Sequence, residues 1–239
     1  MTIIPLRDNV PTRRYPYVNK VLVAINLLVF LYEVVLGREA GLFIYRWGLV
    51  PARLWGAGGG LEMGALWALP GLPPAWLTLV TSMFLHAGWL HVGSNMLYLW
   101  IFGDNVEDRL GHLRYLVFYL LGGVGAGLLQ SIFSAGASVP TIGASGAVAA
   151  VLGAYWLLFP WAKVSTLVPV FFFLTIAEIP AVVFLLLWFL IQLYNGALAI
   201  TASPTLVGGV AWWAHIGGFV VGLLLVRWWG IRRQPPVWW

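Results

Sequence analysis

The stretch Thr141-Ile-Gly-Ala-Ser-Gly-Ala147 opens an apolar run that continues to Phe159 and stops at Pro160. If this run crosses a membrane, its roughly 15 residues span only about 22 Å as a helix. The hydrocarbon core of a bilayer is about 30 Å thick, so the helix must begin inside the membrane. Irregular chain at that depth is tolerated only where protein or a water-filled cavity surrounds it. The hydroxyl of Ser145 is therefore expected in such a surrounding, beside the unpaired N–H groups at a helix start.

The composition indicates that the chain does cross a membrane several times. It has 239 residues, of which 61% are hydrophobic and 9% are charged, and its mean hydropathy is +0.89. Soluble domains carry about 25% charged residues. The net charge of +5 does not indicate nucleic-acid binding, because the basic residues stand at the ends of apolar runs. The absence of cysteine excludes disulfides and a thiol nucleophile.

The apolar runs predict an all-α membrane protein with six transmembrane helices. A polar tail, 1–19, precedes the membrane domain, 20–229, and a short tail, 230–239, follows it. We place the six helices at 20–36, 78–103, 115–133, 145–159, 179–194 and 210–229.

Three connections between these helices are distinctive. The first loop, 37–76, is long and contains apolar pieces, so it is expected to lie on the membrane surface. Residues 164–177 are apolar but broken by Pro169, which favours a surface hairpin or a re-entrant piece over a further helix pair. The last loop, 195–209, carries no charge.

An even number of spans places both termini on one side of the membrane. The positive-inside rule makes that side cytoplasmic, since it holds ten of the 13 basic residues. These are Arg7, Arg13, Arg14, Lys20, Arg109, Arg114, Lys163, Arg227, Arg232 and Arg233. No cleavable signal peptide is evident, and a prokaryotic plasma membrane is the expected location.

Three polar side chains then fall at one depth. Counted from the cytoplasmic ends of their helices, Ser145, His215 and His91 lie about 22, 18 and 20 Å up. All three are thus about 8–12 Å below the outer surface of a 30 Å core. Ionisable residues inside a membrane are costly and point to function.

Each of these residues also has a purely structural interpretation. Ser145 lies in a small-residue face with Gly143 and Gly146, of the kind that lets membrane helices approach closely. Gly218 and Gly222 form a Gly-x-x-x-Gly face on the helix of His215, and packing of the two faces would bring the imidazole toward the hydroxyl. His215 alone could be a buried histidine bonded to a backbone carbonyl. A Ser–His pair needs only hydrogen-bond reach.

His91 and Asn95 are four residues apart and share one helix face. Both can donate hydrogen bonds to an oxyanion, or serve to hold helices together. His86 is expected near the outer interface, either at the site or anchoring a loop. A zinc site of His86, His91 and His215 is not favoured, because the sequence has no His-Glu-x-x-His motif and no carboxylate is expected at this depth. Glu33 and Glu178 are expected near helix ends, so a dyad without a third member is the simpler interpretation.

The sequence resembles the rhomboid family of intramembrane serine proteases. The resemblance covers nearly the whole chain, and four motifs carry it in the family's order. They are His86-Ala-Gly-Trp-Leu-His-Val-Gly-Ser-Asn95, Gly103…Glu107…Gly111…Arg114-Tyr115, Gly143-Ala-Ser-Gly146, and Ala214-His-Ile-Gly-Gly218 with Gly222.

The resemblance implies a catalytic dyad of Ser145 and His215. It implies an oxyanion site made by the Ser145 backbone N–H and the side chains of His91 and Asn95. It also implies a membrane-embedded first loop, with the fifth helix and the 195–209 loop as gate and cap. Ala149 departs from the family, in which many members carry Tyr or Phe four residues after the serine to stack on the imidazole.

The sequence thus predicts a serine endopeptidase that cleaves transmembrane segments of single-span or polytopic membrane proteins through an acyl-enzyme. It needs no cofactor, no metal and no nucleic acid, and its surroundings are the lipid bilayer. Two other functions are alternatives. One is a non-catalytic relative that binds membrane helices. The presence of Ser145, His215 and Asn95 argues against it. The other is a proton-relaying transporter, which would need more charged residues deep in the helices.

Overall fold

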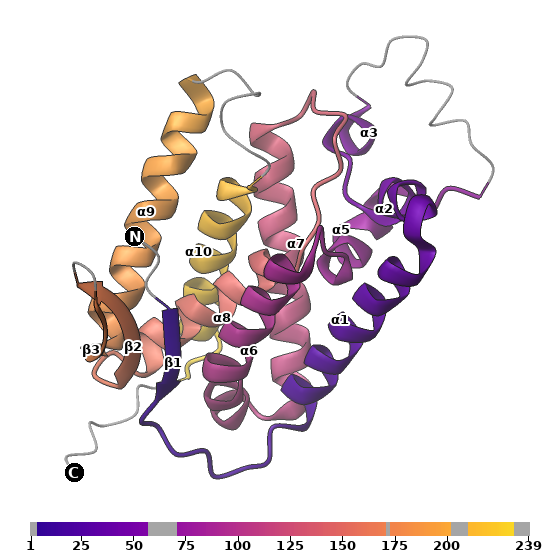
Figure 1. Cartoon of the computed structure of the whole chain (residues 1–239). Helices are drawn as coiled ribbons and strands as arrows, with labels where there is room; N and C mark the ends of the chain where they lie inside the picture. The colour runs from indigo at the N-terminus through magenta and orange to yellow at the C-terminus, as the bar shows by residue number, and fades with distance from the viewer. Residues whose placement is uncertain (1–3, 57–70, 171–172, 202–209, 232–239) are drawn as a thin grey trace.

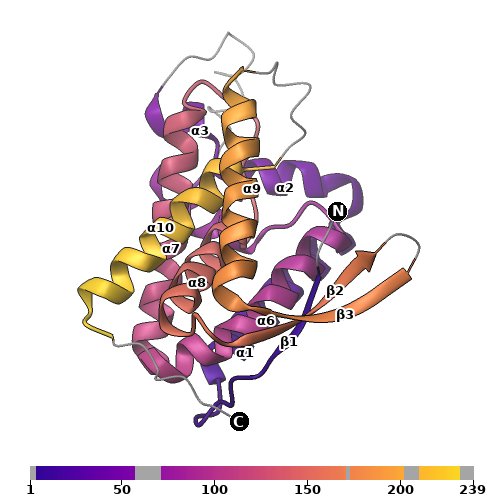
Figure 2. The ribbon, with the colours of Figure 1, turned by 90° about the vertical axis from the view of Figure 1, so that its left-hand side faces the viewer.

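The computed structural model describes residues 4–56, 71–170, 173–201 and 210–231. The described chain is mostly helical, with one small sheet on the side of the helix bundle (Figures 1 and 2). The longer helices are α1 (Tyr17–Leu36), α6 (Trp89–Leu110), α7 (His112–Phe133), α8 (Ser145–Leu158), α9 (Ala181–Thr201) and α10 (Trp212–Trp228). The first loop contributes α2 (Ala40–Trp47) and α3 (Pro51–Trp55), and α5 (Thr78–Thr81) follows. Short 3-10 turns cover Gly37–Glu39, Ala75–Leu77 and Ser82–Phe84.

The helices fit an integral membrane protein. Three stretches are long and apolar enough to cross a bilayer, namely Tyr17–Trp47, His112–Phe133 and Ala181–Ile200. Shorter apolar helices cover Ala75–Phe84, Ser145–Leu158 and Trp212–Trp228. The chain is therefore a helical membrane protein, and the count of six spans stays a prediction. We call the end of the bundle where α1 begins and α6 ends its inner end; it is the lower end in Figure 1.

Helix α8 is the centre of the molecule, enclosed by the other long helices (Figure 1). Apart from Ser145, Trp156 and Leu157, all its residues are buried. Its small side chains allow α10 to approach until backbone meets backbone. A Cβ atom added to Gly222 of α10 would strike the carbonyl oxygen of Ala150, and one added to Gly153 of α8 would strike that of Phe219. Such glycine contacts are the usual means of close helix packing in membranes.

The predicted second helix, 78–103, is wrong at both ends. The helical turns that begin at Thr78 end at Phe84, and α6 starts only at Trp89, after an extended segment. At its other end α6 runs past Asp104 to Leu110. The charged residues there are part of the fold: the buried Glu107 carboxylate accepts hydrogen bonds from the backbone N–H groups of Val18 (3.0 Å) and Asn19 (2.7 Å). A carboxylate at the start of α1 is favoured by the helix dipole.

The first and last predicted loops also contain more helix than expected. Parts of 37–76 form α2 and α3, and the indole N–H of Trp55 in α3 donates to the carbonyl of Ser131 in α7 at 3.0 Å. Helix α9 continues to Thr201, beyond the predicted end at 194. Residues 57–70 and 202–209 of these loops lie outside the described residues, as does 232–239 of the C-terminal tail.

The hairpin prediction for 164–177 is confirmed. Strands β2 (Lys163–Val170) and β3 (Phe173–Pro180) pair antiparallel, with Lys163 opposite Pro180 and Val170 opposite Phe173. The hairpin extends sideways from the bundle between α8 and α9 (Figure 2).

The N-terminal segment was expected to be only a polar tail, which is wrong for residues 4–8. They form β1 (Ile4–Asp8), the third strand of the sheet, which pairs antiparallel with β2. Asp8 fixes this strand to the inner end of the bundle. Its Oδ2 accepts hydrogen bonds from the Tyr155 hydroxyl of α8 (2.5 Å) and from the Asn105 amide of α6 (2.8 Å). Through Asp8, strand β1 therefore links α6 to α8.

Asp8 should make the stability of the protein depend on pH. Burial raises the pKa of its carboxyl from 3.8 to about 6, against the hydrogen bonds from Tyr155, Val10 and Asn105 that favour the charged form. A raised folded-state pKa gives stability that is present below 3.8 and lost as the pH rises through about 6. We expect the unfolding free energy to fall by about 2 kcal/mol between these pH values, which allows for the partial exposure of the group.

In Asp8→Asn this part of the pH dependence should disappear. Denaturation of the two proteins in mild detergent from pH 4 to 7 measures it, with the exposed Glu39→Gln as the control that keeps the wild-type profile. Parallel profiles of wild type and Asp8→Asn would contradict the prediction.

Candidate active site

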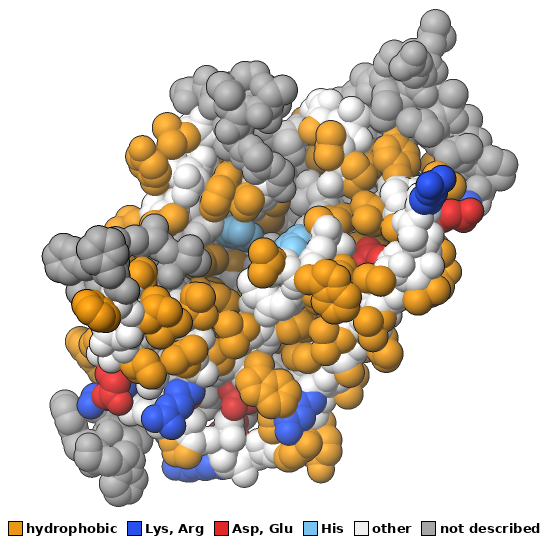
Figure 3. Space-filling view, in the orientation of Figure 1, with side chains coloured by type: hydrophobic (Ala, Val, Ile, Leu, Met, Phe, Trp, Pro, Cys, Tyr) orange, Lys and Arg blue, Asp and Glu red, His pale blue; other side chains and the backbone are white. Residues whose placement is uncertain are grey.

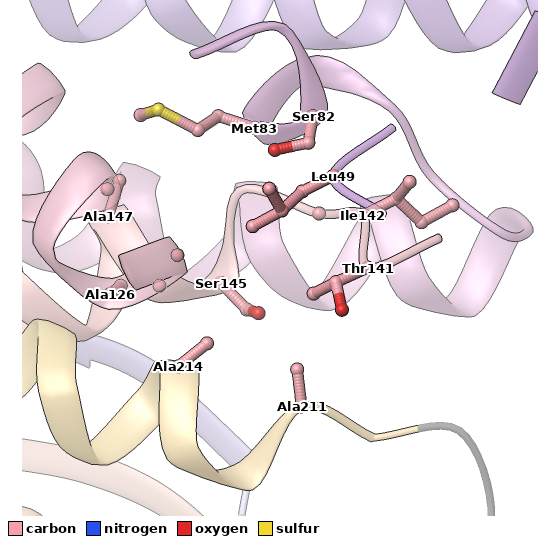
Figure 4. A pocket seen from close by; sticks show the side chains of 14 residues that line it. Leu49, Ser82, Met83, Ala126, Thr141, Ile142, Ser145, Ala147, Ala211 and Ala214 are labelled. Atoms are coloured by element: carbon pink, nitrogen blue, oxygen red, sulfur yellow. The ribbon is translucent and has the colours of Figure 1, made fainter. Parts of the chain in front are cut away.

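A small pocket lies at the N-terminal end of α8, and Ser145 lines it (Figure 4). Its wall comes from segments far apart in the sequence, including Leu49, Ser82, Thr141 and Ala214. Ala144 is the N-cap of α8, and its carbonyl accepts the first helical hydrogen bond, from Val148 at 2.9 Å. The backbone N–H groups of residues 145–147 have no partner within the helix, as at any helix start. The Ser145 hydroxyl thus stands beside unpaired donors and the positive end of the helix dipole.

The loop before Ser145 is fixed by backbone hydrogen bonds to two other segments. Leu49 and Thr141 exchange a pair of hydrogen bonds, of 3.1 and 2.7 Å. The N–H of Gly143 donates to the carbonyl of Ser82 at 2.9 Å. The first loop therefore braces the segment that carries the serine.

Gly143 has a second function in this loop. Its φ of +123° is one that other residues rarely adopt. An added Cβ would also lie only 2.7 Å from Nε2 of His91. Glycine at this position thus lets the His91 imidazole lie directly against the loop that precedes Ser145.

The glycines next to Ser145 and His215 let α8 and α10 meet. A Cβ on Gly218 would strike the carbonyl oxygen of Gly146, and one on Gly146 would lie 3.7 Å from the Cβ of Ala214. Ala214 precedes His215 in the sequence, so the histidine lies in the first turn of α10, next to a residue that faces Gly146. Histidine side chains are visible in a recess on the face shown in Figure 3, while charged side chains gather mainly at the inner end.

The imidazole of His215 is hydrogen-bonded to a residue of α9. Its Nδ1 makes a hydrogen bond of 2.8 Å with Oε1 of Gln192. The rings of Trp188 and Trp212 have their centroids 5.8 and 6.1 Å from the imidazole. Among the hydrogen bonds of the described residues, none joins His215 to Ser145. Catalytic hydrogen bonds are often long in a free enzyme and tighten when substrate binds.

The close packing of α8 against α10 also explains why position 149 carries a small alanine. Its methyl group packs toward Gly218 of α10, and a Cβ on that glycine would lie 3.1 Å from it. An aromatic ring at position 149 therefore has no space against α10, and the imidazole has aromatic neighbours from α9 and from its own helix.

His91 and Asn95 occupy the same helix face, as predicted, and one amide proton of Asn95 is already used in a hydrogen bond. Nδ1 of His91 accepts a hydrogen bond from the N–H of Ala87 at 3.2 Å. In the neutral ring the proton is then on Nε2, the atom that faces Gly143. The Asn95 side chain is buried and donates to the carbonyl of His91 at 2.9 Å. His91 thus offers an N–H to the site, whereas Asn95 would have to rotate or use its second amide proton.

His86 packs behind His91, with ring centroids 5.0 Å apart. Its ring nitrogens are buried without a hydrogen-bond partner in the described structure. Its backbone N–H donates to the Glu33 carboxylate, at 3.1 Å to Oε2. Glu33 lies near the end of α1, as expected, and its buried carboxylate binds the segment before α6. Glu178 lies in β3, where it forms an exposed ion pair of 3.2 Å with Lys163.

Two groups at the site were missed from the sequence. Gln192 was overlooked although it and Asn195 are the two side-chain amides of an otherwise apolar helix, and a polar residue in such a helix is itself a signal of function. The backbone hydrogen bonds from Leu49 and Ser82 to the loop before Ser145 were also missed, because backbone bonds do not depend on the identity of the side chains. Within the described ranges, no group of three or more His, Asp or Glu side chains is arranged to hold a metal ion.

Comparison with known proteins gives consistent results. The profile of the rhomboid domain family matches residues 73–231. The chain is 33% identical to rhomboid-like protein 11, chloroplastic, of Arabidopsis thaliana over 172 residues, which are 68% of this chain and 55% of that protein. It is 32% identical to rhomboid protease GlpG of Yersinia pestis over 151 residues, or 62% of this chain and 46% of the relative.

A third relative is rhomboid protease GluP of Bacillus subtilis, 39% identical over 79 residues, which are 33% of this chain and 15% of that protein. The chain spans about half or less of the length of these relatives. Their names refer to plastids and to bacteria, and another relative is mitochondrial, so they do not select the prokaryotic plasma membrane that was expected.

Proposed function

Because the chain belongs to the rhomboid family, we propose that it is an intramembrane serine endopeptidase that cleaves transmembrane segments of other membrane proteins. One observation supports this most directly. A serine at the start of a buried helix faces a pocket, and glycine contacts bring the histidine-bearing helix α10 against it. Relatives named as rhomboid proteases support the same activity.

In the proposed mechanism Ser145 is the nucleophile and His215 the general base. His215 takes the hydroxyl proton while Oγ attacks the scissile carbonyl, and a tetrahedral intermediate forms. His215 then gives the proton to the leaving amine, which yields an acyl-enzyme. A water molecule, deprotonated in the same way, hydrolyses the ester and restores Ser145.

The negative charge on the intermediate needs donors placed in advance. The free N–H groups at the start of α8 and the Nε2–H of His91 are the candidates with an available proton. Asn95 is proposed as a further donor through its second amide proton. Such donors act strongly in a site from which bulk water is largely excluded.

A helical substrate must unwind locally before its carbonyl can reach Ser145. Small and helix-breaking residues near the cleavage point should therefore favour the reaction, since they lower the cost of unwinding. The bilayer is the expected surrounding of both partners. The proposal includes no metal and no cofactor.

Labelling with a serine-reactive fluorophosphonate tests the proposal. The protein is purified in detergent, treated with the probe, and the modified peptide is identified by mass spectrometry. We expect an adduct on Ser145 that is lost in His215→Ala. We also expect the protein to cleave a transmembrane reporter in liposomes. A folded protein that neither reacts nor cleaves at any pH from 5 to 9 would refute the protease and favour a binding role.

His91→Ala should lower kcat by about 100-fold, because one oxyanion donor is lost. KM for the reporter should change little, since the donor acts on charge that develops during the reaction. Gly93→Ala is the matched control on α6, because a Cβ there meets no atom within 4 Å. Equal kcat values for His91→Ala and Gly93→Ala would exclude His91 as a donor.

A further inference from the structure

Gln192 is the buried polar side chain on the inward face of α9. That face is a stripe spaced by about one turn, made by Ala181, Leu185, Trp188, Gln192 and Gly196. The side chains between these positions are mostly exposed leucines and isoleucines, as suits a helix that faces lipid. An amide in such a helix is costly to bury unless it is hydrogen-bonded. Gln192 is only 5% exposed, so its partners require an explanation.

Both ends of the amide are engaged, and the two bonds fix its direction. Nε2 donates to the carbonyl of Trp188 in the previous turn at 3.1 Å. Oε1 lies 2.8 Å from Nδ1 of His215. The opposite orientation would set the amide oxygen against the Trp188 carbonyl oxygen. Oε1 therefore faces the imidazole, and an amide oxygen can only accept.

This bond determines which nitrogen of His215 carries the proton. With Nδ1–H donating to Oε1, the neutral ring has its lone pair on Nε2. A general base for Ser145 needs that tautomer, as the effect of the carboxylate in serine protease triads illustrates. A neutral amide supplies the orientation without the negative charge of a carboxylate.

The acceptor comes from a helix that packs on the bundle mainly through one face. α9 contacts α8 and α10 through its inward stripe, and much of its remaining surface is exposed. One turn beyond Gln192, Gly196 lets α9 approach α10: a Cβ at this position would lie 3.6 Å from the Cβ of Trp212. A shift of α9 away from α10 separates Oε1 from Nδ1 and frees the imidazole to rotate or to change tautomer.

We propose that Gln192 is a positioning residue that orients His215, so that the dyad is competent only while α9 is packed against α10. The inference rests on the proposed protease function and deepens it. The packing of α9, a helix with a lipid-facing surface, would then decide whether His215 can act as the general base. A substrate that enters by displacing α9 would release the base, and chemistry would resume once α9 returned.

Three variants separate orientation from fold. Gln192→Met keeps an unbranched side chain of similar size and removes the acceptor. Gln192→Glu keeps an acceptor and adds a charge. Asn195→Ala, on the same helix, is the matched control, because among the described residues Asn195 donates only to the Ile191 carbonyl in its own helix. Wild type and variants are compared by kcat and KM on a transmembrane reporter, and by the rate of fluorophosphonate labelling from pH 5 to 9.

We expect Gln192→Met to lower kcat and the labelling rate by 10- to 100-fold, with KM within about threefold of wild type. Gln192→Glu should keep most of the labelling and move the acidic limb of the pH–rate profile to higher pH, because a carboxylate favours the imidazolium. His91 on α6 is the other titratable group that acts on His215, and it is the same in all variants. Wild-type labelling in Gln192→Met would overturn the inference. Equal losses in the Met and Glu variants with an unshifted profile would also overturn it, since they would indicate a fold defect.

A disulfide tests the dependence on α9. The chain has no cysteine, so Gly196→Cys with Trp212→Cys creates a unique pair at a Cβ separation suited to a disulfide. The oxidised and reduced forms of this one protein are compared, which cancels the effect of losing Trp212. Oxidation should preserve or raise labelling by the small probe, and it should not rescue labelling when Gln192→Met is added. Labelling that falls on oxidation would contradict the inference. An inactive, unlabelled wild type would instead refute the protease function itself.

Discussion

Ser145→Ala is expected to abolish cleavage of a transmembrane reporter, with kcat reduced by at least about 10⁴-fold. The substitution removes the nucleophile, and the donors at the start of α8 cannot replace the acyl-enzyme route. Alanine is compatible with the packing, because Ser145 follows Ala144 and precedes Gly146 in a small-residue segment. Initial rates in liposomes and the loss of fluorophosphonate labelling measure the effect, and circular dichroism verifies the fold.

His215→Ala should cause a loss of the same order, and the double variant should lose no more than either single one. Residues that act as one unit show this lack of additivity. The exposed Ser94→Ala on α6 is a suitable control, since its hydroxyl donates only to the His91 carbonyl among the described residues. Losses that multiply in the double variant would mean that the two residues do not share one step.

Gly222→Val is expected to produce the largest loss of stability, about 3 kcal/mol or more. The added Cβ would meet the backbone oxygen of Ala150, which cannot move aside as a flexible side chain would. α8 and α10 would be forced apart, so labelling of Ser145 should fall although both dyad residues are intact. Denaturation in detergent and the labelling rate measure the two effects.

Gly93→Val is the control for the helix propensity of valine, since position 93 of α6 has open space for a Cβ. It should lower stability by about 1 kcal/mol or less. A Gly222→Val protein as stable as Gly93→Val would show that α8 and α10 separate readily, contrary to the packing described here.

The sequence predicted the elements whose causes are local. A short apolar run between a glycine-rich turn and Pro160 predicted α8 from 145 to 159, and the structure has Ser145–Leu158. The Gly-x-x-x-Gly face of α10 predicted contact with a small-residue helix, and Gly218 and Gly222 do face α8. The start and end of α8 and the glycine spacing of α10 can each be recognised from residues that are close together in the sequence.

What the sequence could not predict depends on partners that are distant along the chain. α6 continues beyond Asp104 because Glu107 binds the start of α1. Residues 4–8 form a strand because β2 supplies a paired edge, and nothing in their own pattern requires it. The partner of His215 depends on how α9 is rotated against α10, and one amide in an apolar helix does not determine that rotation.

Strand β1 has a consequence for how the protein is made. Ile4 pairs with Leu167, and Asp8 bonds to Tyr155 at the inner end of α8. A ribosome releases the first strand long before it has synthesised these partners, so the N-terminus must wait unpaired while α1, α6, α7 and α8 enter the bilayer. Docking of β1 is then a late event in biogenesis, and it joins residues 4–8 to the hairpin that is made much later. A bulky protein fused to the N-terminus should therefore slow the docking of β1 onto β2, whereas one fused to the C-terminus should not.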